Sequence, residues 1–255
     1  MQLISKIGSL KIFVTFVKNR KVMHTAQDIE KAMRTVANPE KIKILSGFFK
    51  TGKGEYGEND IFIGVPVPVT RAIAKSHRDT PLAELVQLLH SPVHELRMVA
   101  LLCMVEQFKH ADDNQRTVLY ETYLAHTDCI NNWDLVDLTA AQIVGAYLEH
   151  RDHAPLYRLA QSKLLWEQRI AIVATWQWIR RGHFDDTLAL ADLLLHHDHD
   201  LIRKATGWML REVGKKDKAR LCQFLDSRYR DMPRTTLRYA IERFTPEERR
   251  HYMQR

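Results

Sequence analysis

Residues 164–176 read LLWEQRIAIVATW, and four further segments of the chain repeat this pattern. They are LHSPVHELRMVALL at 89–102, CINNWDLVDLTAA at 129–141, HDHDLIRKATGWML at 197–210 and MPRTTLRYAIERF at 232–244. The segments align on Arg97, Asp134, Arg169, Arg203 and Arg238, which are spaced by 37, 35, 34 and 35 residues. Because apolar residues recur at steps of three and four, each segment is predicted to open a helix that follows another helix.

Helix pairs repeated at this period predict an all-α fold, since each pair can bury its apolar face only by stacking on its neighbours. The pattern typical of tetratricopeptide repeats is missing, so HEAT-like pairs fit better. We therefore expect a curved HEAT-like solenoid (an α-α superhelix) of about six pairs, with a basic concave face. Strand-like alternation is limited to residues 61–67.

Composition narrows the class of protein further. Hydrophobic residues make up 45% of the 255 residues and charged residues 27%, which is ordinary for a globular protein. Three widely spaced cysteines exclude a disulfide framework and fit a reducing compartment, so a cytoplasmic location is expected. The chain contains no uncharged apolar stretch long enough to span a membrane.

The domain organisation is expected to be simple. Residues 1–21 contain five basic and no acidic residues. We expect residues 1–22 to be a basic extension, which is either disordered or the product of a start assigned too early, with Met23 as the true start. Residues 23–255 would form a single HEAT-like domain.

The net charge of +7 is concentrated at the two ends of the chain. Residues 1–53 carry 11 Lys and Arg against 3 Asp and Glu, and residues 203–255 carry 15 against 7. Equivalent positions of successive repeats line one face of a solenoid, and four of the five aligned residues are arginines. Such a row fits contact with a phosphate backbone. The alternative is that the arginines bridge neighbouring repeats by pairing with carboxylates.

The residues best suited to chemistry lie in three successive repeats. Trp133 and Asp137 are four residues apart and share one helix face, and Asn131 or Asn132 is a natural N-cap. On a concave face, Trp133, Asp137, Arg169 and Trp208 would converge. Two indoles, a carboxylate and a guanidinium fit a cation attached to a phosphodiester chain. The alternative is that the tryptophans pack in the core and that Asp134 only stabilises its helix N-terminus.

At these residues the sequence resembles the DNA alkylation repair glycosylases of the AlkD family, which have HEAT-like repeats. The resemblance rests on NWDLVD at 132–137, WEQRIA at 166–171 and RKATGWMLRE at 203–212. A fourth element, IGVPVPVTR at 63–71, corresponds to the family's G-x-x-x-P-x-x-R pattern. The four elements occur in order and with the repeat spacing, over roughly residues 24–245.

The resemblance implies a role for each matching residue. Asp137 falls on the family's catalytic carboxylate, and Trp133 and Trp208 fall on the two aromatic positions that pack against the lesion nucleotide. Arg169 falls on the arginine near the lesion phosphate. Arg71, Arg97, Arg203 and Arg211 complete the predicted DNA-contacting set. The family acts without a metal or organic cofactor and does not depend on a base-flipping pocket.

The implied function is a monofunctional DNA glycosylase for base excision repair, acting as a monomer on positively charged N-alkylated purines in double-stranded DNA. No lysine lies in NWDLVD at 132–137 to act as a Schiff-base nucleophile, so strand cleavage by a lyase step is not expected. The alternative function is non-catalytic binding of distorted or branched DNA, and a protein-binding scaffold is a third. The histidine-rich stretch 196–200 is expected to be a polar loop without metal, and residues 52–59 a loop near DNA.

Overall fold

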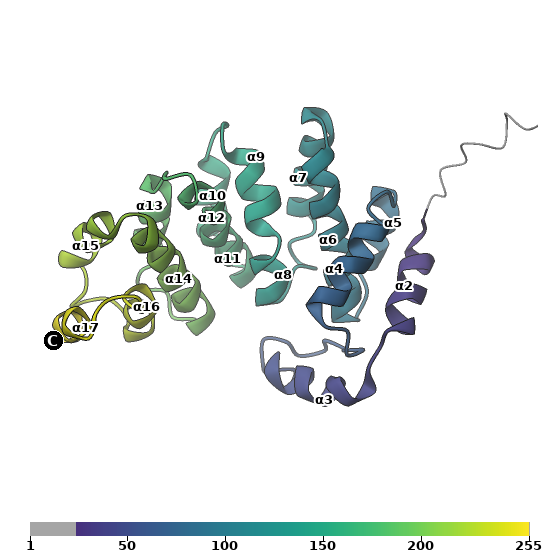
Figure 1. Cartoon of the computed structure of the whole chain (residues 1–255), viewed down its shortest axis with the longest axis horizontal. Helices are drawn as coiled ribbons and strands as arrows, with labels where there is room; N and C mark the ends of the chain where they lie inside the picture. The colour runs from purple at the N-terminus through teal and green to yellow at the C-terminus, as the bar shows by residue number, and fades with distance from the viewer. Residues whose placement is uncertain (1–23, 255) are drawn as a thin grey trace, which may run out of the picture.

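The computed structural model describes residues 24–254 as an arc of helices packed side by side, with α2 near one end and α17 at the other (Figure 1). The prediction for residues 1–22 lies outside the described residues. In chain order the helices are α2 (Ala26–Thr35), α3 (Pro39–Phe48), α4 (Val67–Ser76), α5 (Leu82–Leu89), α6 (His94–His110), α7 (Asp113–Ala125), α8 (Trp133–Asp137), the π-helical η1 (Ala141–Gly145), α9 (Ala146–Leu148), α10 (Ala154–Ala160), α11 (Leu165–Ala174), α12 (Trp176–Ile179), α13 (Asp185–Leu193), α14 (Asp200–Lys216), α15 (Lys218–Asp226), α16 (Arg234–Ala240) and α17 (Pro246–Met253). Across 24–254 the all-α prediction is confirmed, and β-pairing is limited to one bridge between Ile61 and Val93.

The repeat pattern of the sequence corresponds to pairs of packed helices. Each aligned segment supplies a helix, in the order α6, α8, α11, α14 and α16, and each of these follows another helix. Along the arc, α5 packs against α6, α10 against α11, and α14 against α13, α15 and α16. One apolar core runs through the stacked pairs, with buried residues contributed from α2 to α17. The chain therefore has a helical-repeat fold.

Local sequence signals fix where several helices begin. The side chains of Thr25, Asp112 and Thr245 each accept a hydrogen bond from the backbone N–H of the residue three positions later. The acidic or amide side chain of that later residue accepts a hydrogen bond from the backbone N–H of the cap residue. These reciprocal capping boxes satisfy two backbone donors at each helix start. Among the helices of residues 24–254, none has both the length and the apolar character needed to cross a membrane.

The second aligned repeat departs from a regular helix. Helix α8 is only five residues long, and the π-helical turn η1 follows it after a short break. Thr139, within this break, donates its hydroxyl to the carbonyl of Leu135 at 2.5 Å. Asp137 is therefore the last residue of a short helix, whereas the sequence pattern placed it inside a longer one. Single π turns of this kind are often found at functional sites.

The extended segment before α4 is held by one buried carboxylate. Glu95 accepts the backbone N–H groups of Ile63, Gly64 and Val65 at 3.1, 2.8 and 3.2 Å. Gly64 has a φ of +84°, and an added Cβ would lie 2.0 Å from the carbonyl oxygen of Asn38. Glycine is therefore required here, because the backbone of 61–66 crosses directly over the start of α3.

Candidate functional site

A cleft of about 840 Å³ is lined by residues of α3, α8, α11, α14 and α16. Five residues singled out by the sequence line it: Trp133, Asp137, Arg169, Trp208 and Arg211. They come from three successive repeats, as the alignment predicts. The fold thus brings their side chains to one place.

Asp137 and Arg169 form a two-pronged ion pair in this cleft. Arg169 donates Nε–H to Oδ1 of Asp137 at 2.9 Å and Nη2–H to Oδ2 at 2.8 Å. A third bond runs from Nη1 of Arg169 to the carbonyl of Leu201 at 2.5 Å, at the start of α14. The pair thus links three repeats and fixes the orientation of the carboxylate. Paired geometry of this kind is stronger and more specific than a single contact.

Burial shapes the electrostatics of this pair. The Asp137 side chain is 15% exposed, and Arg169 is 5% exposed. Burial raises the pKa of the Asp137 carboxyl above its ordinary value, while the Arg169 charge and hydrogen bonds act in the opposite direction. A carboxylate bonded at both oxygens to a guanidinium keeps its negative charge, because neutralising it would leave Arg169 buried and unpaired.

Aromatic side chains form much of the remaining wall. Trp133 stacks on the buried Phe49 with ring centroids 5.2 Å apart and meets Phe48 edge-on at 5.6 Å. Trp208 lies 5.4 Å from Trp176, and its indole N–H donates to Glu212 at 3.2 Å. Both indoles are half-buried, so each keeps part of its surface in the cleft.

Close helix packing places the wall that carries Trp208. A Cβ added to Gly207 would lie 2.5 Å from the carbonyl oxygen of Thr236. Glycine at this position therefore allows α14 and α16 to approach closely. As a result Trp208 of α14 and Tyr239 of α16 both line the cleft.

The segment 52–59 also reaches the cleft. Tyr56 lines it together with Lys50, and its ring lies 6.1 Å from that of Trp166. Burial raises the pKa of Tyr56 above its ordinary value, with a side-chain hydrogen bond from Trp133 acting in the opposite direction. The sequence indicated a loop near the site but gave no signal for which of its residues would face inward.

In the last two repeats, the residues that line the cleft are one position later than the aligned residues that we predicted. After Arg169, the cleft is lined by Lys204 and then Tyr239, each 35 residues further on, instead of Arg203 and Arg238. Successive residues of an α-helix are rotated by about 100° around its axis, so a shift of one residue turns a side chain away from the cleft. Lys204 therefore supplies a cation to the cleft at the position next to the predicted Arg203.

Of the other predicted DNA-contacting arginines, Arg211 lines the cleft, whereas Arg71, Arg97 and Arg203 lie outside it. Arg203 is partly exposed and donates Nε–H to the carbonyl of His197 at 2.6 Å. Arg71 is exposed on α4, and Arg211 pairs with Glu242 at the rim. Arg97 is 4% exposed and pairs with Asp60, so it occupies the bridging position that we kept as the alternative. Arg97 does not line the cleft, and it also donates to the carbonyl of Ser91 and the side-chain oxygen of Asn131.

A buried polar network supports α8 from behind. His94 contacts Asp60 through Nδ1 at 3.1 Å and Asp134 through Nε2 at 2.9 Å. Arg97 donates to the other oxygen of Asp60 at 2.6 Å, and Asn132, the N-cap of α8, donates to Asp60 at 3.1 Å. Burial opposes protonation of His94, but the bonds to Asp134 and Asp60 outweigh it and raise its pKa to about 9.

This network predicts a pH-dependent stability. An imidazole whose pKa is about 9 in the folded protein and about 6.5 when unfolded stabilises the fold fully below pH 6.5. That contribution, roughly 3 kcal/mol at most, is lost as the pH rises through 9. The free energy of unfolding, measured by urea titration at pH 6.5 and 9, should fall more steeply in the natural protein than in His94→Gln. His90→Gln, on the exposed end of α5, should keep the natural slope; equal slopes in all three proteins would contradict the assignment.

The histidine-rich stretch 196–200 caps the start of α14 and connects it to α11. His199 accepts the backbone N–H of Leu201 at the start of α14, and His197 bonds to Gln168 at 2.8 Å. Within residues 24–254, no group of three or more His, Cys, Asp or Glu side chains is arranged to hold a metal ion.

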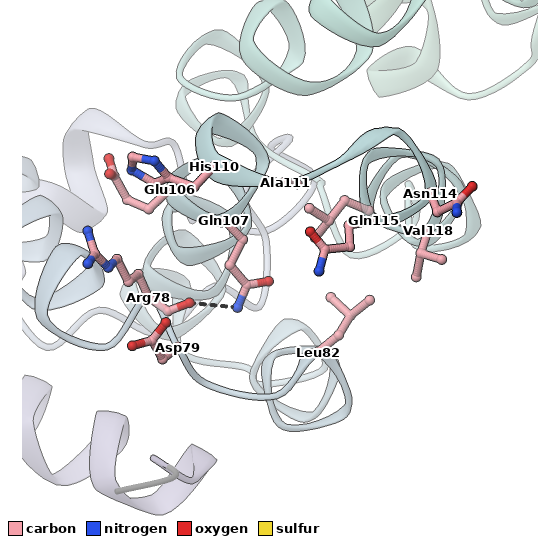
Figure 2. A pocket seen from close by; sticks show the side chains of 11 residues that line it. Arg78, Asp79, Leu82, Glu106, Gln107, His110, Ala111, Asn114, Gln115 and Val118 are labelled. Carbon is pink, nitrogen blue, oxygen red and sulfur yellow. Dashed lines mark hydrogen bonds between the residues drawn. The ribbon is translucent and has the colours of Figure 1, made fainter. Parts of the chain in front are cut away.

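Two further hollows lie outside the cleft. One of about 410 Å³ adjoins the cleft and shares Phe48, Trp133 and Asp137 with it. Its other lining residues are mostly apolar, with Thr70, His94, Glu95 and Asp134 among them. The other, of about 700 Å³, lies where α6 and α7 meet the loop before α5 (Figure 2). There the Gln107 amide donates to the carbonyls of Arg78 and Thr80. None of the predicted site residues lines this second hollow.

Comparison with known proteins places the chain in a family. The family model for DNA alkylation repair enzymes matches residues 29–244. The chain belongs to this DNA alkylation repair family. A solved structure described as a predicted DNA alkylation repair enzyme from Enterococcus faecalis shares 16% sequence identity, with a TM-score of 0.63, over 82% of this chain and 97% of that one. At that identity the likeness shows the fold alone. No curated protein sequence matches the chain.

The match to the DNA alkylation repair family includes the whole cleft. All of the lining residues, from Gly47 to Tyr239, lie within 29–244. The resemblance on the four sequence elements is thereby confirmed at the level of the family. The cleft around Asp137 is accordingly the candidate site for the chemistry of a DNA alkylation repair enzyme.

Proposed function

We propose that this cleft hydrolyses the N-glycosidic bond of positively charged N-alkylated purines, of the 3-methyladenine and 7-methylguanine type, in double-stranded DNA. The observation that carries the proposal is the Asp137 carboxylate, fixed by Arg169 in the same cleft as the indoles of Trp133 and Trp208. The protein would act in base excision repair as a cytoplasmic monomer, with residues 23–255 as one HEAT-like domain and with no metal or cofactor.

The chemistry needs few groups because the substrate is already activated. An N-alkylated purine carries a positive charge, so it leaves the sugar as a neutral base without being protonated. The sugar becomes an oxocarbenium-like cation, which the Asp137 carboxylate stabilises electrostatically. Arg169 occupies one lone pair on each carboxylate oxygen, which leaves the others to orient a water and accept its proton.

The second carboxylate of the cleft is not placed as a general acid. Among the described residues that line the cleft, the carboxylates are Asp137 and Asp200. Asp200 is exposed and pairs with Lys204 at 2.7 Å. Ordinary glycoside hydrolases need one carboxylic acid to protonate the leaving group, and a cationic base removes that need. The arrangement therefore favours cationic lesions over neutral ones.

Contacts to the DNA backbone would surround this centre. Arg169 makes three hydrogen bonds within the protein, and a guanidinium has five N–H donors, so two remain for a phosphate beside the lesion. We propose that Lys204 shares this role inside the cleft, and that Arg71, Arg203 and Arg211 contact phosphates further along the strand. Arg97 is left out of this set because it lies outside the cleft and pairs with Asp60.

The proposal is tested by the bases that the protein releases from duplex DNA treated with a methylating agent. Chromatography of the supernatant should detect 3-methyladenine or 7-methylguanine above spontaneous loss, and the relative amounts would define the preference between them. Binding of the same DNA without any base release would favour the non-catalytic alternative. Absence of DNA binding would point to a protein-binding scaffold.

The role of Lys204 predicts a specific salt dependence. Lys204→Ala should make the slope of log affinity against log salt, measured on undamaged duplex, shallower by about 0.9, which corresponds to one phosphate contact. Lys218→Ala is the matched control, since Lys218 also pairs with a carboxylate, Glu248, but lies outside the cleft. Equal slopes for both variants would contradict a phosphate contact at Lys204.

A further inference from the structure

His199 lines the cleft but has no part in the chemistry proposed for Asp137. It is the half-buried residue directly before α14, the helix that also brings Lys204 and Trp208 to the cleft. An imidazole has two ring nitrogens, and in the neutral ring one donates a hydrogen bond while the other accepts. The bond that one nitrogen makes therefore decides what the other can do.

The start of α14 fixes the proton of His199 on Nε2. The backbone N–H of Leu201 donates to Nδ1 of His199 at 3.2 Å. Because a backbone N–H can only donate, Nδ1 must be the acceptor, and the neutral ring carries its proton on Nε2. The backbone N–H of His199 in turn donates to Nδ1 of His197 at 3.0 Å, and Nε2 of His197 bonds to Gln168 at 2.8 Å. The residue is thus held in one place and in one tautomer.

The surroundings of His199 favour the neutral form of its ring. Burial lowers the pKa of His199 below its ordinary value, the carboxylate of Asp200 opposes this shift, and the charge of Arg169 adds to it. Protonation would also place a hydrogen on Nδ1, where it would face the N–H of Leu201 with no acceptor between them. His199 is therefore a neutral group whose one ring donor is the Nε2–H.

This donor is free to bind a ligand. Within the described part of the chain, no atom accepts a hydrogen bond from Nε2 of His199. Leu201, which donates to the ring of His199, also gives its carbonyl to Nη1 of Arg169 at 2.5 Å. His199 and Arg169 are thus bound to the same residue and are neighbours in the cleft. The Nε2–H adds a third donor to the two that Arg169 leaves unused.

Several donors side by side select an anionic oxygen as the acceptor. The carboxylates that line the cleft do not compete for this role, because Asp137 is bound by Arg169 and Asp200 by Lys204. Four further carboxylates at its edges are also engaged, two by backbone N–H groups of their own loop and two by basic side chains: Glu55, Glu58, Glu212 and Glu242. An acceptor from outside is required, and phosphate oxygens take a large share of the hydrogen bonds that proteins make to DNA.

We propose that His199 is a further binding residue of the cleft, whose Nε2–H donates to a phosphate oxygen of the damaged strand beside Arg169. This inference rests on the proposed function for the presence of DNA in the cleft. Because the ring is neutral, the contact would orient the strand without displacing a counterion, in contrast to the contact proposed for Lys204. The donor is fixed by α14, so it would set how closely the strand approaches Asp137.

Two variants separate the roles of the two ring nitrogens. His199→Asn keeps an acceptor near the position of Nδ1, and asparagine is a favoured N-cap, but its side chain is too short to reach the position of Nε2. His199→Gln can place an amide N–H near the position of Nε2 but loses the cap. The affinity for undamaged duplex should fall roughly fivefold in His199→Asn and less than about twofold in His199→Gln. The melting temperature should fall in His199→Gln alone.

The dependence of binding on salt tests whether the donor is neutral. His199→Asn should keep the natural slope of log affinity against log salt, since a neutral group releases no counterion. His196→Asn is the matched control, because His196 lies in the same stretch but is exposed outside the cleft, and it should match the natural protein in affinity, slope and melting temperature. Nitrogen-15 NMR of the free protein near neutral pH should show the imidazole that is missing from His199→Asn with its proton on Nε2.

The outcomes separate this contact from the proposed function. Natural affinity in His199→Asn would overturn the contact even if alkylated bases are released. A selective loss of affinity in His199→Asn, in a protein that releases no base, would support the contact and reject the glycosylase. A shallower salt slope in His199→Asn, or a proton on Nδ1 in the NMR spectrum, would overturn the neutral donor. A natural protein that binds no duplex would overturn both proposals.

Discussion

Asp137→Asn is expected to lower the single-turnover rate of 7-methylguanine excision by at least about a hundredfold. The substitution keeps the shape of the side chain but removes the negative charge that stabilises the oxocarbenium-like sugar. Binding to undamaged duplex should not weaken, because a charge that repels phosphate has been removed. The measurement is the rate of base release with enzyme in excess over a duplex that contains one lesion.

Asp200→Asn provides the matched control for this variant. Asp200 lines the same cleft but pairs with Lys204, so the loss of its charge should change the rate by less than about fivefold. Asp137→Asn also leaves Arg169 without its anionic partner, so thermal unfolding must confirm that the variant is folded at the assay temperature. An excision rate in folded Asp137→Asn within a few fold of the natural rate would remove the proposed role of Asp137.

The second large effect separates lesion charge from lesion shape. The protein should release 7-methylguanine from a duplex and release uracil or hypoxanthine at least about a hundredfold more slowly. A neutral base leaves as an anion unless it is protonated, and Asp137 is held as a carboxylate by Arg169. The attraction between a cationic base and the indole faces of Trp133 and Trp208 would also be absent.

The comparison needs one protein preparation and three oligonucleotides of the same sequence context. Each reaction is followed by base release under single-turnover conditions, and binding of each duplex is measured separately. Similar binding with different rates would place the discrimination in the chemical step. Efficient release of uracil would require a general acid in the cleft and would contradict the mechanism.

The helical-repeat fold could be predicted from the sequence because its signal is repeated. Five segments share a spacing near 35 residues, and each carries the same apolar periodicity, so an error in one leaves the others intact. The end of α8 was less predictable. The sequence pattern predicts that the helix beginning at Trp133 continues past Asp137. In the structure the hydroxyl of Thr139 donates to the carbonyl of Leu135, and a π-helical turn follows. Such breaks depend on packing against other repeats.

The centre of the candidate site could also be anticipated, since Trp133, Asp137, Arg169 and Trp208 lie near the aligned residues of three successive repeats. The choice between phosphate contact and bridging could not be made for each arginine. Arg97 is buried because Asp60, 37 residues earlier in the chain, reaches it through a loop that has no repeat counterpart. That partnership is a tertiary contact with no local signature.

The part of the cleft wall that comes from residues 47–56 could not be predicted from the repeat pattern. Phe48 and Tyr56 come from α3 and the loop after it, which precede the first aligned segment. Lys204 and Tyr239 were missed for a different reason, because the alignment was anchored one residue earlier on Arg203 and Arg238. A one-residue shift changes which side chain faces the cleft while leaving the repeat spacing almost unchanged.

The most direct test of the central claim is base release from a duplex that contains a single 7-methylguanine. The natural protein in excess should liberate free 7-methylguanine well above the spontaneous rate. It should leave an intact strand that breaks at the lesion only after treatment with alkali. Tight binding of that duplex with no more free base than the protein-free control would contradict the claim that the cleft around Asp137 is a glycosylase site.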